Sequence, residues 1–555
     1  MSSHFSFNAQ VSPEAIEKVG RLFNALIDDI LNELLQNARR AGATKVVIDQ
    51  GDDLRFGRAI IVADNGQGIA DPRSLFSLGH SAWSEALTQS EDAAGMGFFA
   101  LANRGAALVA RRKDTALSWS IEATSEAFHG RQPIDVIDGP PGIEGVTVIF
   151  PELDHDYVAD AVRRAARFYP IPVIFNREEM PRSDFLGDAK HIEEWRGVRI
   201  GVFDHDSVHT DNANANFHGV TLRMPLPTLS QHWHGNYWAA IDVVDCANLK
   251  LVLPARKEVV RNAMFDALAE EVQRLYFRLV SENGPHSLSF KAYRRGLALG
   301  IDLEEAEPRL APFTPSVADT DRFVIRAPQP VSSDALLYAG EGPLEEQIVA
   351  RAFARTGESL PMFEPHNAYT GYGWYDRLRR ITLRSYRMHI GSTYQKIDPF
   401  DLFEGDGRPD ILEVDVQVSD GESECGWLLP TDLIVTDPEY GTLDDVNIQV
   451  TKESDITPSE LQTFLTDALF LPSDDVDAGS YEQQQQWFDD EAEDRCIRLL
   501  QSGPDADLNA IVRTVRRELL WRVPKQGSFV IHIENGEISV AGLPTAGRTE
   551  PSPSS

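Results

Sequence analysis

The apolar residues between positions 22 and 42 recur in pairs spaced four residues apart, which predicts an amphipathic helix. The pairs form one stripe along that helix, namely Leu22/Phe23, Leu26/Ile27, Ile30/Leu31 and Leu34/Leu35. Gly42 offers a C-cap, and the following run 44–49 is typical of a strand. We therefore expect this helix to pack on a core and to turn directly into a strand.

The rest of the chain contains patterns typical of helices and patterns typical of strands. Short apolar runs bounded by turn residues predict strands at 58–64, 145–150, 169–176, 198–203, 219–224, 240–244, 411–418 and 528–534. Longer amphipathic patterns predict helices at 157–168, 263–280, 344–355, 458–469, 481–501 and 507–521, and an apolar helix follows the glycines within 94–102. This mixture predicts an α/β (α+β) multidomain fold.

A chain of 555 residues has room for about three domains. We expect a first domain at 1–155 and a second α/β domain at 156–307. The proline-rich stretch 308–335 reads as a linker, and 336–546 as an α/β C-terminal domain of unknown role. The end, 547–555, has prolines among serines and is expected to be a disordered tail.

Polar residues of interest occur at three places in the first domain. Glu33 and Asn37 lie one helical turn apart, and their oxygens suit a water molecule and a hard cation. Asp64 ends a predicted strand and precedes a glycine-containing turn. Each pattern alone also has an ordinary interpretation, since Glu33 and Asn37 could lie on a solvated helix edge and most such turns bind nothing.

In combination the motifs carry more information. Glu-Leu-Leu-Gln-Asn-Ala, Asp-Asn-Gly-Gln-Gly-Ile and Gly-Met-Gly-Phe-Phe follow one another in the chain. This series resembles the N, G1 and G2 boxes of the GHKL ATPase superfamily, which unites gyrase B, Hsp-ninety chaperones, sensor histidine kinases and MutL. The resemblance covers about residues 10–155 and extends more weakly to 280. It implies a Bergerat-type ATP-binding α/β sandwich and then a transducer-like α/β domain.

The resemblance also implies roles for residues, with ATP and Mg²⁺ as cofactors. Glu33 matches the general base that activates the attacking water, Asn37 the Mg²⁺ ligand, and Asp64 the acceptor for the adenine amino group. The glycines match backbone positions around the nucleotide: Gly66 and Gly68 beside the base, Gly95 and Gly97 at the hinge of a lid. That lid would include residues 77–84.

A basic residue of the second domain is expected to reach the γ-phosphate. Leu-Pro-Ala-Arg-Lys-Glu is similar to the Hsp-ninety middle-domain segment with that role, which makes Arg256 the candidate and Lys257 the next. An exposed basic turn before a helix is the alternative. Two positions depart from the family pattern: Asp92 replaces a glycine of the Hsp-ninety third box, and Val146 follows Gly145 where the family has threonine.

Glu33 stands where histidine kinases usually have asparagine, so we expect an ATP hydrolase and not a protein histidine kinase. The third box looks closer to Hsp-ninety-like and MORC-like proteins than to MutL. The expected function is an ATP-driven conformational clamp in a chaperone or remodelling role, with dimerisation through the ATPase domain implied by the family. Two alternatives stay open: a MutL/MORC-like DNA-linked ATPase in genome maintenance or defence, and a non-hydrolysing nucleotide-sensing scaffold.

The net charge and its distribution along the chain indicate which kinds of partner the protein can bind. The net charge is −34, and residues 401–500 hold 27 Asp and Glu against 4 Lys and Arg. This segment should repel nucleic acid, and it is either a solvated acidic face or a surface for a basic protein partner or client. The chain has three scattered cysteines and no apolar run near the ~20 residues of a membrane helix, so a reducing cytoplasm without a membrane is expected.

Overall fold

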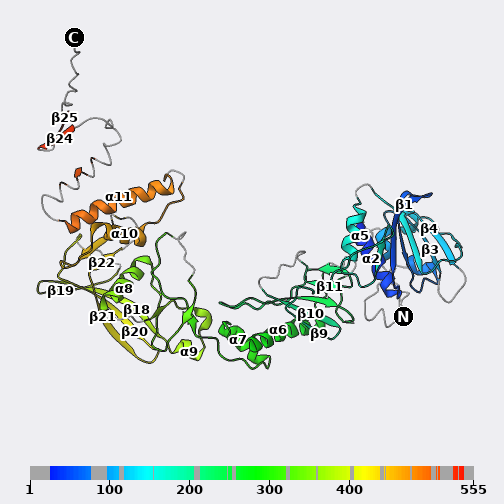
Figure 1. Ribbon diagram of the computed structural model, residues 1–555, viewed down its shortest axis with the longest axis horizontal. Helices are drawn as coiled ribbons and strands as arrows, with labels where there is room; N and C mark the ends of the chain where they lie inside the picture. Colours follow the sequence, from blue (N-terminus) through cyan, green and yellow to red (C-terminus); the bar gives the residue numbers. More distant parts are fainter. Residues whose placement is uncertain are drawn as a thin grey trace, which may run out of the picture. The chain divides into compact units, whose positions relative to one another are not determined.

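The computed structural model describes residues 26–76, 97–111, 118–153, 156–204, 213–246, 248–252, 258–319, 326–357, 361–399, 405–437, 443, 445–475 and 478–501, together with 508, 511, 512, 515, 529–534 and 537–542. The chain divides into two compact units, residues 1–307 and 308–555 (Figure 1). Both units combine sheets with helices, so the fold is a multidomain α+β fold, as the sequence predicts.

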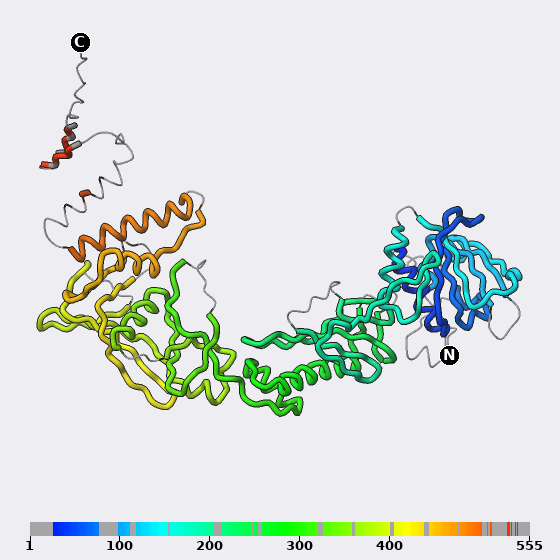
Figure 2. The backbone as a smooth tube through the Cα atoms, viewed as in Figure 1, coloured from blue at the N-terminus to red at the C-terminus, as the bar shows by residue number. Residues whose placement is uncertain are grey.

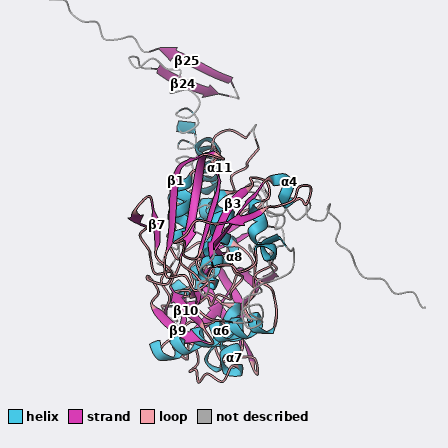
Figure 3. Cartoon of the chain, turned by 90° about the vertical axis from the view of Figure 1, so that its right-hand side faces the viewer, coloured by secondary structure: helices cyan, strands magenta, loops and turns pink. Residues whose placement is uncertain are grey.

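The first sheet has eight strands in the order β5-β4-β3-β6-β2-β1-β7-β8. Their bounds are β1 (Val46–Asp53), β2 (Gly57–Asp64), β3 (Ala106–Arg111), β4 (Ser118–Ala123), β5 (Val136–Asp138), β6 (Val146–Pro151), β7 (Val173–Phe175) and β8 (Glu178–Glu179). All neighbours pair antiparallel except β1 and β7, which run parallel. Strands β1, β3 and β7 are labelled in Figure 3.

One helical layer packs on this sheet. It consists of α2 (Ile27–Arg40), the 3₁₀ helices η1 (Pro72–Phe76) and η2 (Gly97–Leu101), α4 (Ser125–Phe128) and α5 (Val158–Ala166). Alternate residues of the strands, such as Val46, Ile48, Ile60 and Val62, share a core with the apolar stripe of α2. Figure 1 shows α2 and α5 beside the strands.

Two expectations for this region differ from the structure. The apolar stretch at 94–102 forms only η2, a single short 3₁₀ helix from Gly97, within the described residues. Strand β7 belongs to the first sheet, where its flank is tied to β1 by the Val46 N–H, which donates to the Pro172 carbonyl at 3.0 Å. The boundary expected at residue 155 therefore falls inside the segment that completes the first sheet.

A smaller sheet follows in the same unit, in the order β12-β11-β13-β10-β9. Its strands are β9 (His191–Trp195), β10 (Val198–Phe203), β11 (Ala215–Phe217), β12 (Val220–Leu222) and β13 (Trp238–Val243). The long helix α6 (Ala263–Asn283) shares the core of this sheet and is N-capped by Asn262, whose side chain accepts from the Met264 and Phe265 N–H groups. Helix α7 (Phe290–Ala298) comes next.

The second unit contains a sheet in the order β17-β16-β18-β20-β21, with β19 paired to β18. Its strands are β16 (Leu336–Tyr338), β17 (Met362–Phe363), β18 (Arg379–Ile390), β19 (Thr393–Ile397), β20 (Ile411–Ser419) and β21 (Glu424–Thr431). Around it lie η3 (Asn367–Tyr369), α8 (Pro343–Thr356), α9 (Gly373–Asp376), α10 (Pro458–Leu469), α11 (Tyr481–Leu500) and the hairpin β22 (Leu433–Thr436) with β23 (Asn447–Val450). Figure 2 traces this path and the separate hairpin β24 (Phe529–Glu534) with β25 (Glu537–Gly542).

The proline-rich segment expected as a linker is partly packed on the second unit. It contains β14 (Arg309–Leu310) paired with β15 (Gln329–Pro330). The Phe313 N–H donates to the Met362 carbonyl at 2.9 Å, and the Ala318 N–H donates to the Asp467 carbonyl at 2.7 Å. Phe313 also packs against the core of this unit. Residues 309–319 of the proline-rich segment are therefore attached to the rest of the second unit by hydrogen bonds and apolar packing.

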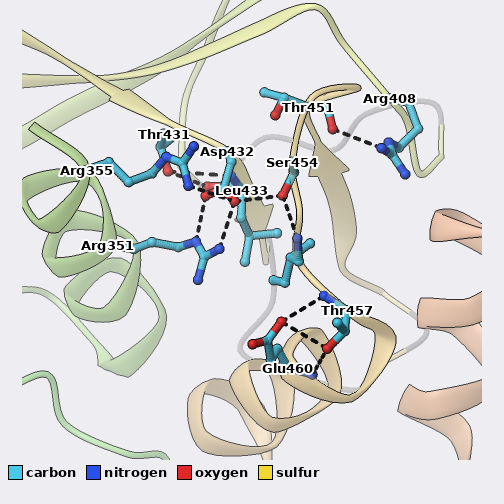
Figure 4. Close-up of polar contacts among 11 residues, drawn as sticks. Arg351, Arg355, Arg408, Thr431, Asp432, Leu433, Thr451, Ser454, Thr457 and Glu460 are labelled. Carbon is cyan, nitrogen blue, oxygen red and sulfur yellow. Dashed lines mark hydrogen bonds and ion pairs between the residues drawn. The ribbon is translucent and has the colours of Figure 1, made fainter.

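A buried carboxylate holds α8 to the turn between β21 and β22. Asp432 is 1% exposed in its side chain and accepts hydrogen bonds from Arg351 at 2.7 and 2.8 Å (Figure 4). Arg355 lies 3.2 Å away, and the Ser454 hydroxyl donates to the same carboxylate at 2.7 Å. These partners satisfy a charge that would otherwise be costly to bury.

Over the part of the chain that the structure describes, no helix is both long and apolar enough to cross a membrane.

Candidate functional site

Helix α2 carries Glu33 and Asn37, two of the predicted site residues. Asp28 and Asp29 lie in its first turn, and Arg39 and Arg40 lie in its last turn, which complements the helix dipole. The helix is closed by Gly42, whose φ is +67° and whose N–H donates to the Arg39 carbonyl. The predicted C-cap therefore has the backbone conformation that favours glycine, and the chain enters β1 directly.

The two polar residues of α2 differ in burial. Glu33 is only 7% exposed, whereas Asn37 is half-buried. A solvated helix edge, the ordinary interpretation of this pair, does not describe Glu33. Because a carboxylate is costly to bury, cores seldom contain one without a polar partner or a use.

Asp64 is the last residue of β2 and interrupts an otherwise apolar row across the sheet. Its register partners are Val46 on β1 and Val146 on β6. Both valines belong to or pack against the core under the helices, so the Asp64 side chain faces the same layer. Thr147 lies on the opposite face, since successive strand residues alternate. The Thr147 hydroxyl therefore lies on the opposite face of the sheet from the Asp64 side chain. The order Gly145-Val146-Thr147 in the sequence predicts this placement.

Two glycines allow main chain to approach Asp64 closely. The Gly66 N–H donates to Asp64 Oδ1 at 2.7 Å, and a Cβ atom on residue 66 would lie 2.6 Å from Ala41 Cβ. Gly145 has a φ of +63°, and a Cβ atom there would lie 2.1 Å from the Asp64 carbonyl oxygen. A side chain at either position would force its neighbours to move, so glycine at 66 and 145 is what permits this close approach of main chain to Asp64.

Asn65 joins the loop after β2 to the turn after α2. Its Oδ1 accepts from the Thr44 N–H at 2.8 Å and the Lys45 N–H at 3.2 Å, and its Nδ2 donates to Thr44 Oγ1 at 2.8 Å. The Gln67 N–H adds a bond to the Ala41 carbonyl at 2.9 Å. The end of the helix with Glu33 and Asn37 is thus attached directly to the loop that begins at Asp64.

The same loop is held at its far end by β4. The Trp119 indole N–H donates to the Ile69 carbonyl at 2.9 Å, and Gly68 has a φ of +73°. Only glycine adopts that conformation readily, which explains a glycine at this position irrespective of any ligand. Both ends of the loop 65–69 are therefore positioned by contacts that its sequence supplies.

The third box lies next to α2. Gly97 begins η2, which packs against α2 and places Phe98 and Phe99 in the shared core. Gly95 and Asp92 lie outside the described residues, as does the expected lid at 77–84. Arg256 and Lys257 are also outside them. The flanks of that segment pair with each other, because the Val252 N–H donates to the Glu258 carbonyl at 2.8 Å.

A buried ion pair connects the segment after η2 to the segment before α5. Arg104 follows η2 and Asp156 precedes α5, and their side chains are 2% and 1% exposed. One guanidinium nitrogen donates to Asp156 Oδ1 at 3.0 Å and a second contacts Oδ2. The Leu153 N–H also donates to that carboxylate at 2.9 Å. The start of α5 is thereby attached to the segment that follows the third box.

Sequence reasoning did not single out Gln36, Tyr169 or the side chain of Asn65. Gln36 is 4% exposed and its Nε2 donates to the His218 carbonyl of the second sheet at 2.8 Å. The Tyr169 hydroxyl donates to the Leu35 carbonyl at 2.6 Å. A glutamine within the apolar-facing half of α2 was the one available signal, since such a residue needs a partner.

No protein-family model matches this chain, and no curated protein matches it. Among solved structures, the ATPase region of topoisomerase II from Saccharomyces cerevisiae is similar over 44% of this chain and 78% of its own, with 11% identity and a TM-score of 0.31. That score is too low to establish a shared fold.

Proposed function

We propose that this chain binds ATP in its first domain and hydrolyses it with Mg²⁺. The observation that carries the proposal is the surroundings of Asp64: a carboxylate in an apolar row, approached by backbone at Gly66 and Gly145, and attached through Asn65 to the helix of Glu33 and Asn37. The order of the three boxes supports the same assignment.

Asp64 would recognise the adenine amino group. A carboxylate accepts at several positions, and the Gly66 N–H uses one of them at Oδ1. An exocyclic amino group is a donor, so it complements a carboxylate, while a carbonyl at the same place would be repelled. Gly66 and Gly68 would let the flat base lie against main chain.

Glu33 and Asn37 would act at the phosphate end of the nucleotide. Glu33 would accept a proton from the attacking water, and its burial supports a position away from bulk solvent. The Asn37 carbonyl oxygen would be a protein ligand of Mg²⁺, which supplies charge neutralisation on the phosphates.

The second domain would close on the bound nucleotide. Arg256, or Lys257 beside it, is the residue we assign to the γ-phosphate, and its flanks form a paired hairpin base at residues 250–252 and 258–260. Gly95 and Gly97 would serve as lid hinge. Closure of this kind is the basis for an Hsp-ninety-like clamp acting on a protein client, with the ATPase domains pairing transiently.

The acidic second unit bears on the partner. Residues 401–500 have far more acidic than basic groups, 27 against 4, so internal ion pairs leave most of the negative charge uncompensated. A basic protein surface fits this unit better than nucleic acid, whose phosphates would be repelled.

Nucleotide titration of three full-length proteins tests the adenine assignment: wild type, Asp64→Asn and Asp49→Asn. Asp49 is a matched control, because it lies on the neighbouring strand β1 with its side chain on the other face of the sheet. We expect Asp64→Asn to weaken ATP binding roughly tenfold or more, the scale of a lost hydrogen bond to a charged group.

The control should bind as wild type does. Equal affinity for ATP in wild type and Asp64→Asn would contradict the assignment of Asp64. A wild type that binds no ATP would contradict the proposed function as a whole.

A further inference from the structure

The turn of α2 between Glu33 and Asn37 touches the second sheet of the same unit. Gln36 lies within that turn, and its Nε2 donates to the His218 carbonyl at 2.8 Å and approaches the Phe217 carbonyl at 3.5 Å. Phe217 is the last residue of β11, and His218 lies in the two-residue turn between β11 and β12. A side chain on the helix of Glu33 and Asn37 is thus bonded to the turn that joins β11 and β12 of the second sheet.

Tyr169 reinforces the same contact. Its hydroxyl donates to the Leu35 carbonyl at 2.6 Å, one residue before Gln36. Its ring lies against Gly219 of the β11–β12 turn, where a Cβ atom would be 3.1 Å from Tyr169 Cβ and where φ is +101°. The helix, the tyrosine and the turn therefore form one continuous contact, which we call the α2 joint (Leu35, Gln36, Tyr169, His218 and Gly219).

Hydrogen bonds of Asn216 attach the β11–β12 turn to the second sheet. Asn216 is 3% exposed, and its Oδ1 accepts from the Gly219 N–H at 2.8 Å. Its Nδ2 donates to Asp242 Oδ1 of β13 at 2.8 Å and to the Phe168 carbonyl at 3.3 Å. A displacement of the second sheet would accordingly move the turn with it and reach α2 through Gln36.

We propose that Gln36 is a positioning residue, through which the second sheet sets the position of Glu33 and Asn37. Gln36 lies three residues after Glu33 and immediately before Asn37, so the joint holds the helical turn that presents both side chains. Small displacements of reacting groups reduce turnover strongly while affinity for the ground state changes little. The effect on turnover rests on the proposed function, whereas the mechanical link between the two sheets does not.

The test compares full-length wild type with Gln36→Glu and Gln36→Met. Gln36→Glu has nearly the same shape, but it replaces the amide donor by a carboxylate oxygen that faces the Phe217 and His218 carbonyls. Gln36→Met keeps the length of the side chain and removes its polar group. Asp28→Asn is the matched control, because it loses an exposed α2 ion pair to Arg164 of α5 and no contact to the second sheet. Three quantities are measured on each: amide hydrogen exchange over 215–222, ATP affinity, and kcat.

Both Gln36 variants should exchange faster over 215–222 by about fivefold, the effect of one lost buried hydrogen bond. They should also lower kcat by about fivefold or more while ATP affinity stays within about twofold. Asp28→Asn should leave the exchange over 215–222 and the kcat of wild type unchanged.

Unchanged exchange over 215–222 in both Gln36 variants would overturn the inference, whatever the nucleotide data show. So would faster exchange with the wild-type kcat in an active enzyme, because Gln36 would then only contribute to folding stability. If wild type binds no ATP but the Gln36 variants loosen 215–222, the link between the sheets is supported and the proposed function is the part that fails.

Discussion

Gly145 lies so close to Asp64 that a Cβ atom on residue 145 would stand 2.1 Å from the Asp64 carbonyl oxygen. Asp64 ends β2, and Gly145 immediately precedes the neighbouring strand β6 and has a left-handed φ of +63°. No other residue type satisfies both conditions. The end of β2, where the proposed adenine contact lies, therefore depends on a glycine that precedes another strand.

Gly145→Ala should consequently weaken ATP binding and destabilise the fold together. The added methyl must displace the backbone of Asp64, and the strain at φ adds about 1 kcal/mol. Gly142→Ala is the matched control, since it has a φ of +81° in the same loop with nothing within 4 Å of the added carbon. Chemical denaturation and ATP titration of both variants check this, and equal behaviour of the two would contradict the close approach.

Asn65→Ala should reduce ATP affinity with a modest loss of stability. The substitution removes two bonds accepted from backbone N–H groups and one donated to Thr44, about 1 kcal/mol each at most when solvent partly replaces them. Thr44→Val removes only the hydroxyl contact and should cost less. If Asn65→Ala binds ATP as tightly as wild type, the attachment of α2 to the loop is irrelevant to the site.

Asp156→Asn should be among the most destabilising single changes in the unit 1–307, by about 3–5 kcal/mol, because it removes the carboxylate that meets a buried guanidinium. Glu152→Gln breaks the neighbouring pair with Arg58, which is 71% exposed, and should cost at most about 1 kcal/mol. Urea unfolding of the two variants gives the comparison. Similar losses would show that the Arg104 pair is better solvated than the structure indicates.

The contribution of Asp432 should depend on pH. Burial raises the pKa of this carboxyl, but the hydrogen bonds from Arg351 and Ser454, together with the positive charges of Arg351 and Arg355, hold the pKa below its ordinary value of 3.8. The stabilisation is therefore complete above the unfolded-state pKa and is lost as pH falls through the lower folded-state pKa.

Asp432→Asn should thus lower the free energy of unfolding by roughly 2–3 kcal/mol at pH 7, the scale of hydrogen bonds to a charged group. The gap to wild type should narrow below about pH 4. Thermal unfolding of the full-length proteins from pH 3 to 7 measures the gap, and a gap that is constant over this range would contradict the assigned role of the charge.

Elements with clear periodicity could be predicted well. Strand β10, helix α10 and the C-terminal glycine of α2 lie where the residues place them, because local propensity and burial agree there. Strand β18 was missed, since its exposed positions are occupied by arginines such as Arg380 and Arg384, which obscure the alternation. The run containing β7 was placed in the segment 156–307, whereas β7 pairs with β1 of the first sheet, because an apolar run carries no information on its partner.

The residues of the candidate site also differ in whether a local sequence pattern predicts them. The roles proposed for Glu33, Asn37 and Asp64 come from the order of the motifs, and a turn after Asp64 is expected from its glycines. Gln36 and Tyr169 were not found, because their roles come from contacts with residues more than a hundred positions away in the chain, and no local pattern encodes these. Such long-range hydrogen bonds become visible only when the sheets are placed against the helix.

Steady-state ATP hydrolysis with Mg²⁺ tests the central claim most directly, measured on wild type and Glu33→Ala with nucleotide affinity determined on the same samples. The account predicts that Glu33→Ala binds ATP about as tightly as wild type and loses nearly all turnover, because only the proton acceptor for the attacking water is removed. Wild-type hydrolysis no faster than that of Glu33→Ala, with ATP bound by both, would contradict the assignment of an ATP hydrolase and favour a nucleotide-sensing scaffold.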